Sequence, residues 1–223
     1  LFEHQLRRLN QLLNRLVASS AFYRERLSQL TLPVTSLQQW SQLPLSNKTD
    51  LAGDGSTDLA ITHTFERSKY TRLHRTSGTR GKPLLIMDTP DDWQWWLDTW
   101  QYVWDVADLE PHETVFMAFS FGPFIGFWSA FDAAIQRGFQ VIPGGGLSTL
   151  ARLQLMRTSQ ATVLCCTPSY AIHLAEEATR NGINVHDIGI KTIVVAGEPG
   201  GSIESIRQRI EGLWQARLVD HAG

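Results

Sequence analysis

The sequence has only two cysteines, an almost balanced charge and no long hydrophobic run. Its cysteines are neighbours in an apolar segment, TVLCCTP, which favours a buried strand in a reducing compartment over a disulfide framework. Twenty basic and 22 acidic residues leave a formal net charge of -2, so we expect no attraction to nucleic acid or to an anionic membrane. No apolar run reaches the roughly 20 residues that span a bilayer. We therefore expect a cytoplasmic protein whose partners are small molecules.

Motifs for metals and dinucleotides are also missing. Zinc ligands normally stand at characteristic separations, and neither His173 nor His186 stands at such a separation from the cysteine pair, so we assign no metal ligand within the chain. The glycine clusters at 143–146 and 197–201 both miss the G-x-G-x-x-G spacing of a dinucleotide site. Both clusters follow predicted strands, at the end where open α/β sheets bind ligands, so each is either a tight turn or part of a site.

The pattern of apolar residues predicts an N-terminal helical arm followed by an α/β core. In residues 1–30 leucines recur near the 3.6-residue period of an amphipathic helix. From about Tyr70, short apolar runs alternate with helical patterns. The predicted strands are PLLIM, TVFMAF, FQVIP, TVLCC, TIVVAG and ARLVD. The predicted helices between them lie at about 90–107, 124–137, 147–159, 168–181 and 202–213.

Short apolar strands joined through helices imply an α/β fold with a mostly parallel sheet flanked by helices. We accordingly divide the chain into a helical arm with its connecting segment, residues 1–69, and a core, residues 70–223. The apolar stripe of the arm has to be buried, either on the core or on a second subunit, so a homodimer is among the expected partners. On the helix at 90–107, four tryptophans recur at helical spacing. We interpret them as core packing rather than as a ligand platform.

The most informative segment runs from Arg75 to Pro83 and reads RTSGTRGKP. Its glycines let backbone N–H groups approach an anion, and its hydroxyls and lysine add donors and positive charge, a combination that suits a polyphosphate. It differs from a Walker A loop because Gly78 and Gly81 are too close together and Pro83 replaces the residue that would hold magnesium. On these residues alone, a phosphate site and an exposed turn both remain open.

Taken together, these segments resemble the phenylacetate–coenzyme A ligases of the adenylate-forming superfamily. RTSGTRGKP is similar to the glycine-rich loop S-[ST]-G-T-T-G-K-P, and VLCCTPSYAIHLAE is similar almost letter for letter to a segment of these ligases. AGEP stands where the family has G-A-E-P, and the terminal DHAG matches the start of its D-x-x-G-x-[ST]-E motif. The match runs in the expected order from about Phe22 to the last residue. It implies the N-terminal domain fold of adenylate-forming enzymes.

The resemblance also implies the site residues, position by position. Those that would bind the ATP phosphates are Thr76, Ser77, Gly78, Thr79, Gly81 and Lys82. Those that would line the adenine are Gly197, Glu198 and Pro199. Those that would lie between the adenine and the acyl group are Asp220, His221, Ala222 and Gly223. Those that would contact the acyl substrate are Phe121, Phe124, Ala196 and His221. The chain departs from the family pattern at Arg80, at the inverted pair Ala196-Gly197, and at Phe119 and Phe121, where tyrosines are frequent.

The implied reaction is the activation of a carboxylate by ATP and Mg²⁺ to an acyl-adenylate, followed by thioester formation with coenzyme A. Two alternatives stay open: transfer of the acyl group to a carrier-protein thiol, and a non-catalytic nucleotide- or acyl-binding module. The family's magnesium-binding glutamate and catalytic lysine would follow Gly223, so no catalytic residue is assigned here. Since the chain also begins at Leu1 rather than at a methionine, we expect it to be part of a longer protein.

The phenylalanines at 119–127 are open to two interpretations, core packing or the wall of a ligand pocket. The resemblance places Phe121 and Phe124 at the pocket. Phenylalanine cannot hydrogen-bond a substrate hydroxyl as tyrosine can, so we expect an aromatic monocarboxylate with an unsubstituted or weakly polar ring, such as phenylacetate or a benzoate. Because an apolar pocket separates close homologues only about 10- to 200-fold, we expect the specificity to be broad.

Overall fold

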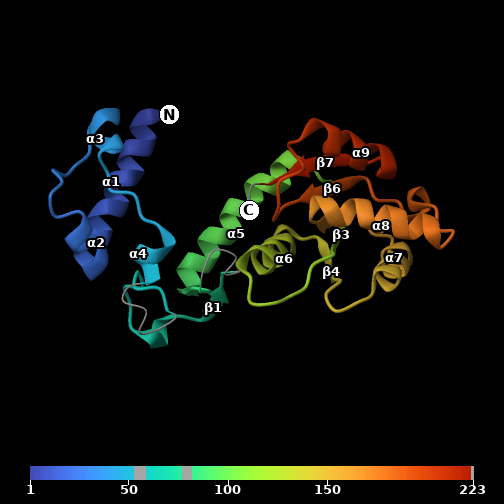
Figure 1. Ribbon diagram of the computed structural model, residues 1–223, viewed down its shortest axis with the longest axis horizontal. Helices are drawn as coiled ribbons and strands as arrows, with labels where there is room; N and C mark the ends of the chain where they lie inside the picture. Colours follow the sequence, from blue (N-terminus) through green and yellow to red (C-terminus); the bar gives the residue numbers. More distant parts are fainter. Residues whose placement is uncertain (53–58, 77–81, 222–223) are drawn as a thin grey trace. The chain divides into compact units, whose positions relative to one another are not determined.

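In the computed structural model the described residues are 1–52, 59–76 and 82–221 (Figure 1). By their contacts they separate into two units, Leu1–Pro90 and Asp91–Gly223. Residues 70–90 therefore group with the helices that precede them. The division of the whole protein into an arm and a core stays a prediction.

The first unit begins with one long helix and three short ones, which share a small core. They are α1 (Phe2–Ser19), α2 (Ala21–Arg26), α3 (Leu37–Ser41) and α4 (Lys48–Ala52). The predicted amphipathic stripe of α1 packs on the segments that follow it, and the buried members of this core are Leu13, Leu27 and Val34. The Asn10 side chain accepts from the Val34 N–H at 2.8 Å and donates to the Val34 carbonyl at 2.7 Å, which ties the segment around Val34 to α1.

A two-stranded antiparallel sheet completes the first unit, after the 3-10 turn η1 (Arg67–Lys69). It pairs β1 (Arg72–Arg75) with β2 (Leu85–Asp88), so that Arg72 faces Asp88 and Arg75 faces Leu85. The predicted strand PLLIM is thus present as β2, but its expected place in the parallel sheet was wrong. Strand β1 was missed because its sequence, RLHR, has one apolar residue among polar and charged ones. Its strand conformation is stabilised by pairing with β2 rather than by its own residue types.

The second unit is built on a five-stranded, fully parallel sheet, which confirms the predicted fold class. Its strands are β3 (Thr114–Met117), β4 (Gln140–Pro143), β5 (Val163–Cys166), β6 (Thr192–Val195) and β7 (Arg217–Asp220). They lie in the order β4-β3-β5-β6-β7. Every residue of the central strands β5 and β6 is buried, as expected for a parallel sheet covered on both faces.

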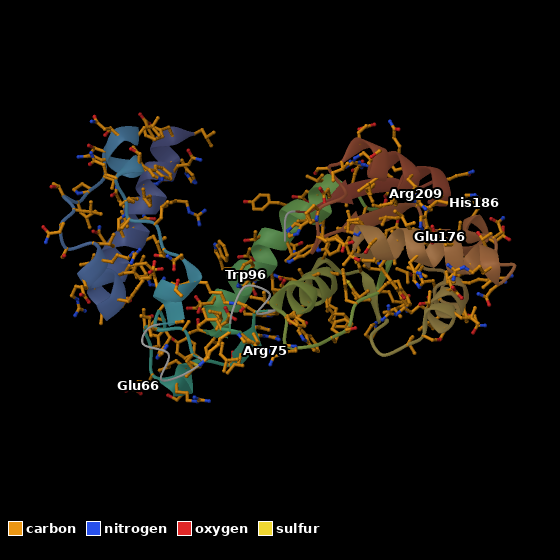
Figure 2. The ribbon with its side chains drawn as sticks, in the orientation of Figure 1. Glu66, Arg75, Trp96, Glu176, His186 and Arg209 are labelled. Carbon is orange, nitrogen blue, oxygen red and sulfur yellow. The ribbon has the colours of Figure 1, made fainter. Side chains whose placement is uncertain are left out.

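Helices cover the two faces of this sheet in separate groups, which can be followed in Figure 1. One group is α5 (Pro90–Ala107) and α6 (Ile125–Arg137), and the other is α7 (Thr149–Thr158), α8 (Pro168–Arg180), η2 (Val185–Ile188) and α9 (Glu204–Trp214). The five α-helices lie within two residues of their predicted ends. On the outer surface, Arg209 of α9 and Glu176 of α8 form an ion pair with N and O 2.7 Å apart (Figure 2).

The tryptophans of α5 pack into the core, as predicted. Trp93, Trp100 and Trp104 are buried on the sheet face that α5 shares with α6. Trp93 Nε1 donates to the Asp132 carboxylate at 2.9 Å, and Trp100 Nε1 donates to the Ser129 hydroxyl at 2.8 Å, so both join α5 to α6. Neither α5 nor another helix in the described part of the chain has the length and apolar content needed to cross a membrane.

Candidate functional site

The predicted site residues of the second unit lie where strands β3, β6 and β7 end. Because the strands are parallel, the loops that follow them all leave the sheet at one edge. Val195 of β6 is paired with Asp220 of β7, and the His221 N–H donates to the Val195 carbonyl at 2.9 Å. This pairing brings Asp220 and His221 next to the start of the segment that contains Ala196 and Gly197.

The segment after β6 turns sharply and is fastened to the neighbouring helix α8. Gly197 has a φ of +92°, a left-handed conformation that favours glycine. The Glu198 carboxylate accepts from the Ser169 N–H at 2.7 Å. Hydrogen bonds from Ser169, and a further one from Thr167, lower the pKa of Glu198 against a smaller opposing effect of burial. With its carboxylate engaged in this way, Glu198 can present its backbone, rather than its charge, to a ligand.

Two further glycines let this loop lie close to its surroundings. A Cβ atom at Gly200 would stand 2.7 Å from Cβ of Pro168, and one at Gly201 would stand 2.6 Å from Cγ of Asp220. The Ser202 hydroxyl donates to the Asp220 carboxylate. Asp220 is therefore held by groups from the β6 loop. We did not assign Gly200, Gly201, Ser202 or Ser169 a role from the sequence, although two stand in the GEPGG cluster and Ser169 in the TPSY segment.

His221 is half-buried and stacks on Trp100 of α5, with ring centroids 4.4 Å apart and an angle of 21° between the planes. Burial lowers the pKa of His221, and the nearby Asp220 charge opposes that effect only in part. The imidazole is therefore favoured in its neutral form. A flat, neutral ring at the end of β7 suits contact with an aromatic or heterocyclic group better than contact with a cation.

The aromatic segment after β3 divides between core and surface. Phe119 is buried and packs with α5 and α6, which supports core packing for that residue. Phe121 is partly buried, with its ring centroid 5.0 Å from that of Trp128 and 5.4 Å from that of Phe131. Phe124, directly before α6, also keeps part of its surface accessible. Within this segment, the two residues assigned to the substrate, Phe121 and Phe124, both remain partly accessible.

The glycine-rich segment belongs to the first unit, where its two ends are described. The Thr76 N–H donates to the Leu84 carbonyl, and the Leu84 N–H donates to the Thr76 hydroxyl, both at 3.0 Å. The Thr76 hydroxyl can still donate its own hydrogen to an anion. Lys82 is exposed. The other predicted residues that lie outside the described ones are Ser77, Gly78, Thr79, Gly81, Ala222 and Gly223, and Arg80 lies outside them as well.

Metal-ligating side chains do not gather in the described part of the chain. Within residues 1–52, 59–76 and 82–221, no three His, Cys, Asp or Glu side chains come together in a way that could hold a metal ion. Cys165 and Cys166 are buried, unpaired thiols, and burial raises the pKa of each.

Sequence comparison relates nearly the whole chain to one kind of enzyme. It is 29% identical over 212 residues to the phenylacetate–coenzyme A ligase of Pseudomonas putida, covering 94% of this chain and 47% of that enzyme. The Escherichia coli phenylacetate–coenzyme A ligase is 28% identical, with 93% of this chain and 47% of that enzyme covered. The resemblance to phenylacetate–coenzyme A ligases is confirmed. The chain spans about half the length of these ligases. No protein-family model matches it.

Structural comparison gives a consistent result. A 2-hydroxyisobutyryl-CoA ligase in complex with 2-HIB-AMP and CoA matches with a TM-score of 0.89 and 26% identity, over 98% of this chain and 52% of that one. The same ligase in its thioesterification state has a TM-score of 0.90. A luciferase-like enzyme from Zophobas morio, 14% identical with a TM-score of 0.52, shares the fold alone. The chain therefore has the fold of adenylate-forming CoA ligases.

Proposed function

We propose that the protein containing this chain activates a carboxylic acid with ATP and transfers the acyl group to coenzyme A. The proposal rests on the arrangement of residues at the carboxyl ends of the parallel strands. There Ala196, Gly197, Asp220 and His221 are brought together in a fold shared with a ligase that was solved with an acyl-adenylate and CoA. The phenylacetate–coenzyme A ligases of similar sequence support the same reaction.

In the first half-reaction a carboxylate oxygen bonds to the α-phosphorus of ATP while the bond from that phosphorus to the bridging oxygen breaks, so pyrophosphate leaves. In the second, the sulfur of coenzyme A loses its proton and attacks the acyl carbon, and AMP leaves with the electron pair of the broken C–O bond. The protein has to hold two anions together and to offset negative charge on the phosphate oxygens. We assign phosphate contacts to Thr76, Lys82 and the loop between them. Magnesium, when bound, supplies further positive charge there.

The same proposal assigns the adenine to the backbone at 197–199. These residues are exposed and Gly197 has a positive φ, so backbone groups of this turn are available to a base. Asp220 and His221 would then lie between the adenine and the acyl group. The neutral, stacked imidazole of His221 offers a flat apolar face on the acyl side.

We propose an aromatic monocarboxylate as the acid. The relatives of similar sequence are named for phenylacetate, whereas the solved ligase is named for 2-hydroxyisobutyrate. Phe121 and Phe124 supply accessible apolar ring surface and no hydroxyl group, which favours the aromatic acid of the first group. We also propose a cytoplasmic location, in keeping with two unpaired cysteines. A homodimer stays a prediction.

Lys82→Ala tests the assignment of the phosphate site in the full-length protein. Removing a charge-assisted contact worth about 1.5–3 kcal/mol should slow ATP–pyrophosphate exchange by roughly 10- to 100-fold. Lys69→Ala is the matched control, because Lys69 is also exposed and lies in the same unit but outside the glycine-rich segment. ATP–pyrophosphate exchange at the wild-type rate in Lys82→Ala would mean that Lys82 does not bind the phosphates.

A panel of carboxylates in a pyrophosphate-release assay, run with and without coenzyme A, tests the substrate. Phenylacetate and benzoates should be preferred, and coenzyme A should convert the adenylate to a thioester detectable by mass spectrometry. A strong preference for a hydroxylated or aliphatic acid would reject the aromatic assignment. No pyrophosphate release with any acid would reject the enzymatic function.

A further inference from the structure

A buried arginine lies under the loops that follow β3 and β4. Arg152, in the first turn of α7, is 8% exposed. Its Nε donates to the Gly144 carbonyl at 2.8 Å, its Nη1 is 3.4 Å from the Ala118 carbonyl, and its guanidinium carbon lies 5.0 Å from the ring centroid of Tyr170. Burial of a charge is unfavourable unless hydrogen bonds compensate for it, and here the compensating groups are main-chain carbonyls at strand ends. Arg152 thus joins β3, β4 and α8 at one point.

The two carbonyls that Arg152 binds stand at the starts of two loops that touch each other. After Ala118 the chain continues to Phe119 and Phe121, and after Gly144 it continues to Gly145. A Cβ atom at Gly145 would stand 2.9 Å from Cδ2 of Phe121 and 3.1 Å from the Phe119 carbonyl oxygen. Distances this short leave no room for a side chain. The loop after β4 therefore lies directly against the Phe121 ring.

The ring of Phe121 is consequently held by two sets of contacts. Trp128 and Phe131 contact it edge to face, and Gly145 lies directly against its Cδ2 atom. The aromatic neighbours belong to α6, whereas the position of Gly145 depends on the β4 loop, which Arg152 fastens through Gly144. A shift of that loop would free the ring to move and would change the shape of the surface that Phe121 presents.

We propose that Arg152 is a positioning residue for acyl specificity, and that Gly145 is the residue through which it acts on Phe121. The proposal rests on the proposed function, in which Phe121 forms part of the acyl pocket. The contacts of Arg152 are with the two main-chain carbonyls and the Tyr170 ring, so it would act on the substrate through the loops. Its role is to hold the loops after β3 and β4 in the arrangement that keeps the Phe121 ring in place for an aromatic acid.

Arg152→Met in the full-length protein tests this directly, because methionine keeps the apolar part of the side chain and removes the guanidinium. Steady-state pyrophosphate release would be measured with phenylacetate and with acetate. Displacement of the Phe121 ring should lower kcat/KM for phenylacetate relative to acetate by about 10- to 100-fold, mainly by raising KM for the acid. KM for ATP should change less than about 2-fold. Arg152→Lys should restore part of the ratio, since an ammonium can reach one of the two carbonyls. Arg157→Met, an exposed position on the same helix, is the control.

Gly145→Ala tests the second half of the proposal, and it remains informative if Arg152→Met does not fold. The added methyl group should displace the Phe121 ring and lower the phenylacetate-to-acetate ratio, with little change in KM for ATP. Gly212→Ala is the matched control, because a Cβ atom there meets nothing within 4 Å.

The outcomes separate this proposal from the one on which it rests. Variants that melt at lower temperature but keep the wild-type ratio of the two acids would show that Arg152 and Gly145 act on stability alone, and would overturn the specificity role while leaving the reaction intact. A wild-type protein that releases no pyrophosphate with any acid would overturn both proposals.

Discussion

The two units of this chain keep their polypeptide in place by different means. In Asp91–Gly223 a five-stranded sheet is covered on both faces, and large side chains such as Trp104, Trp214 and Phe116 are wholly or almost wholly buried. In the described part of Leu1–Pro90 the helical core has three buried side chains, none of them fully buried, and Leu1 and Leu45 remain almost fully exposed. Hydrogen bonds between its segments also hold this unit together, among them the bonds of Asn10 to Val34.

The difference bears on how each unit can position a ligand. In the second unit the site residues stand on loops whose ends are fixed by buried strands, so their geometry follows from the packing of the whole unit. In the first unit the glycine-rich segment is carried by two short strands, and its ends are held by hydrogen bonds between Thr76 and Leu84. Local polar contacts should therefore matter more for the first unit, and core packing more for the second.

The largest expected effect on stability comes from replacing a buried tryptophan of the second unit, which can be compared with a tryptophan of the first. Trp214 is 2% exposed and its Nε1 donates to the Ala171 carbonyl at 2.9 Å, so Trp214→Ala should lower the free energy of unfolding by about 3–5 kcal/mol. Trp40 is only partly buried, and Trp40→Ala should lower it by about 1–2 kcal/mol. Urea denaturation followed by circular dichroism measures both. Equal losses would mean that the first unit is as tightly packed as the second.

An intermediate effect is expected at the buried pair of the antiparallel sheet. His74 Nδ1 and the Asp88 carboxylate are 3.1 Å apart, and both residues are buried. Asp88→Asn should destabilise the protein by about 1.5–3 kcal/mol, because it removes a charge-assisted hydrogen bond from a buried site. Asp50→Asn weakens the more exposed pair with Arg26 and should change stability by less than about 1 kcal/mol. If the two variants unfold at the same urea concentration, the buried pair stabilises this unit no more than the exposed pair does.

The smallest effect concerns pH and belongs to the second unit. Burial lowers the pKa of His221 below its ordinary 6.5, so at pH values under 6.5 the unfolded chain binds more protons there than the folded one. This contribution to stability is present above pH 6.5 and is lost as the pH falls through the folded pKa. His221→Phe keeps a ring on Trp100 and should flatten the dependence of melting temperature on pH between about 7 and 5. His186→Phe, at an exposed position, should leave the slope unchanged, and an unchanged slope in His221→Phe would contradict the assignment.

Much of the second unit could be predicted because its local signals agree with its fold. Helix α8 begins where Thr167 caps the Tyr170 N–H and Pro168 takes the first helical position, and the apolar strands TVLCC and TIVVAG are too short and too β-branched to be read as helices. The antiparallel pair β1–β2 could not be predicted in the same way. Its pairing joins residues on either side of the glycine-rich segment, and the charged sequence of β1 carries no strand pattern.

For the candidate site, residue types could be predicted and contacts could not. The family resemblance points to Glu198, but not to the hydrogen bond that its carboxylate accepts from Ser169, in the first turn of α8. The cluster PGGG marks a turn, but its sequence does not say that Gly145 leaves room for Phe121 or that Arg152 holds Gly144. Such contacts join residues that are far apart in the sequence, and their geometry depends on how several elements pack together. The pattern of a single sequence contains no information about such contacts.

The position of the two cysteines in β5 has a practical consequence. Both thiols lie inside the central strand of the sheet and are held in the unreactive protonated form, since burial raises the pKa of each. Alkylating reagents should reach them only when the sheet opens. A cysteine introduced at an exposed position could then carry a fluorescent label without replacement of the native pair, and the slow labelling of that pair would time the rare openings of the sheet.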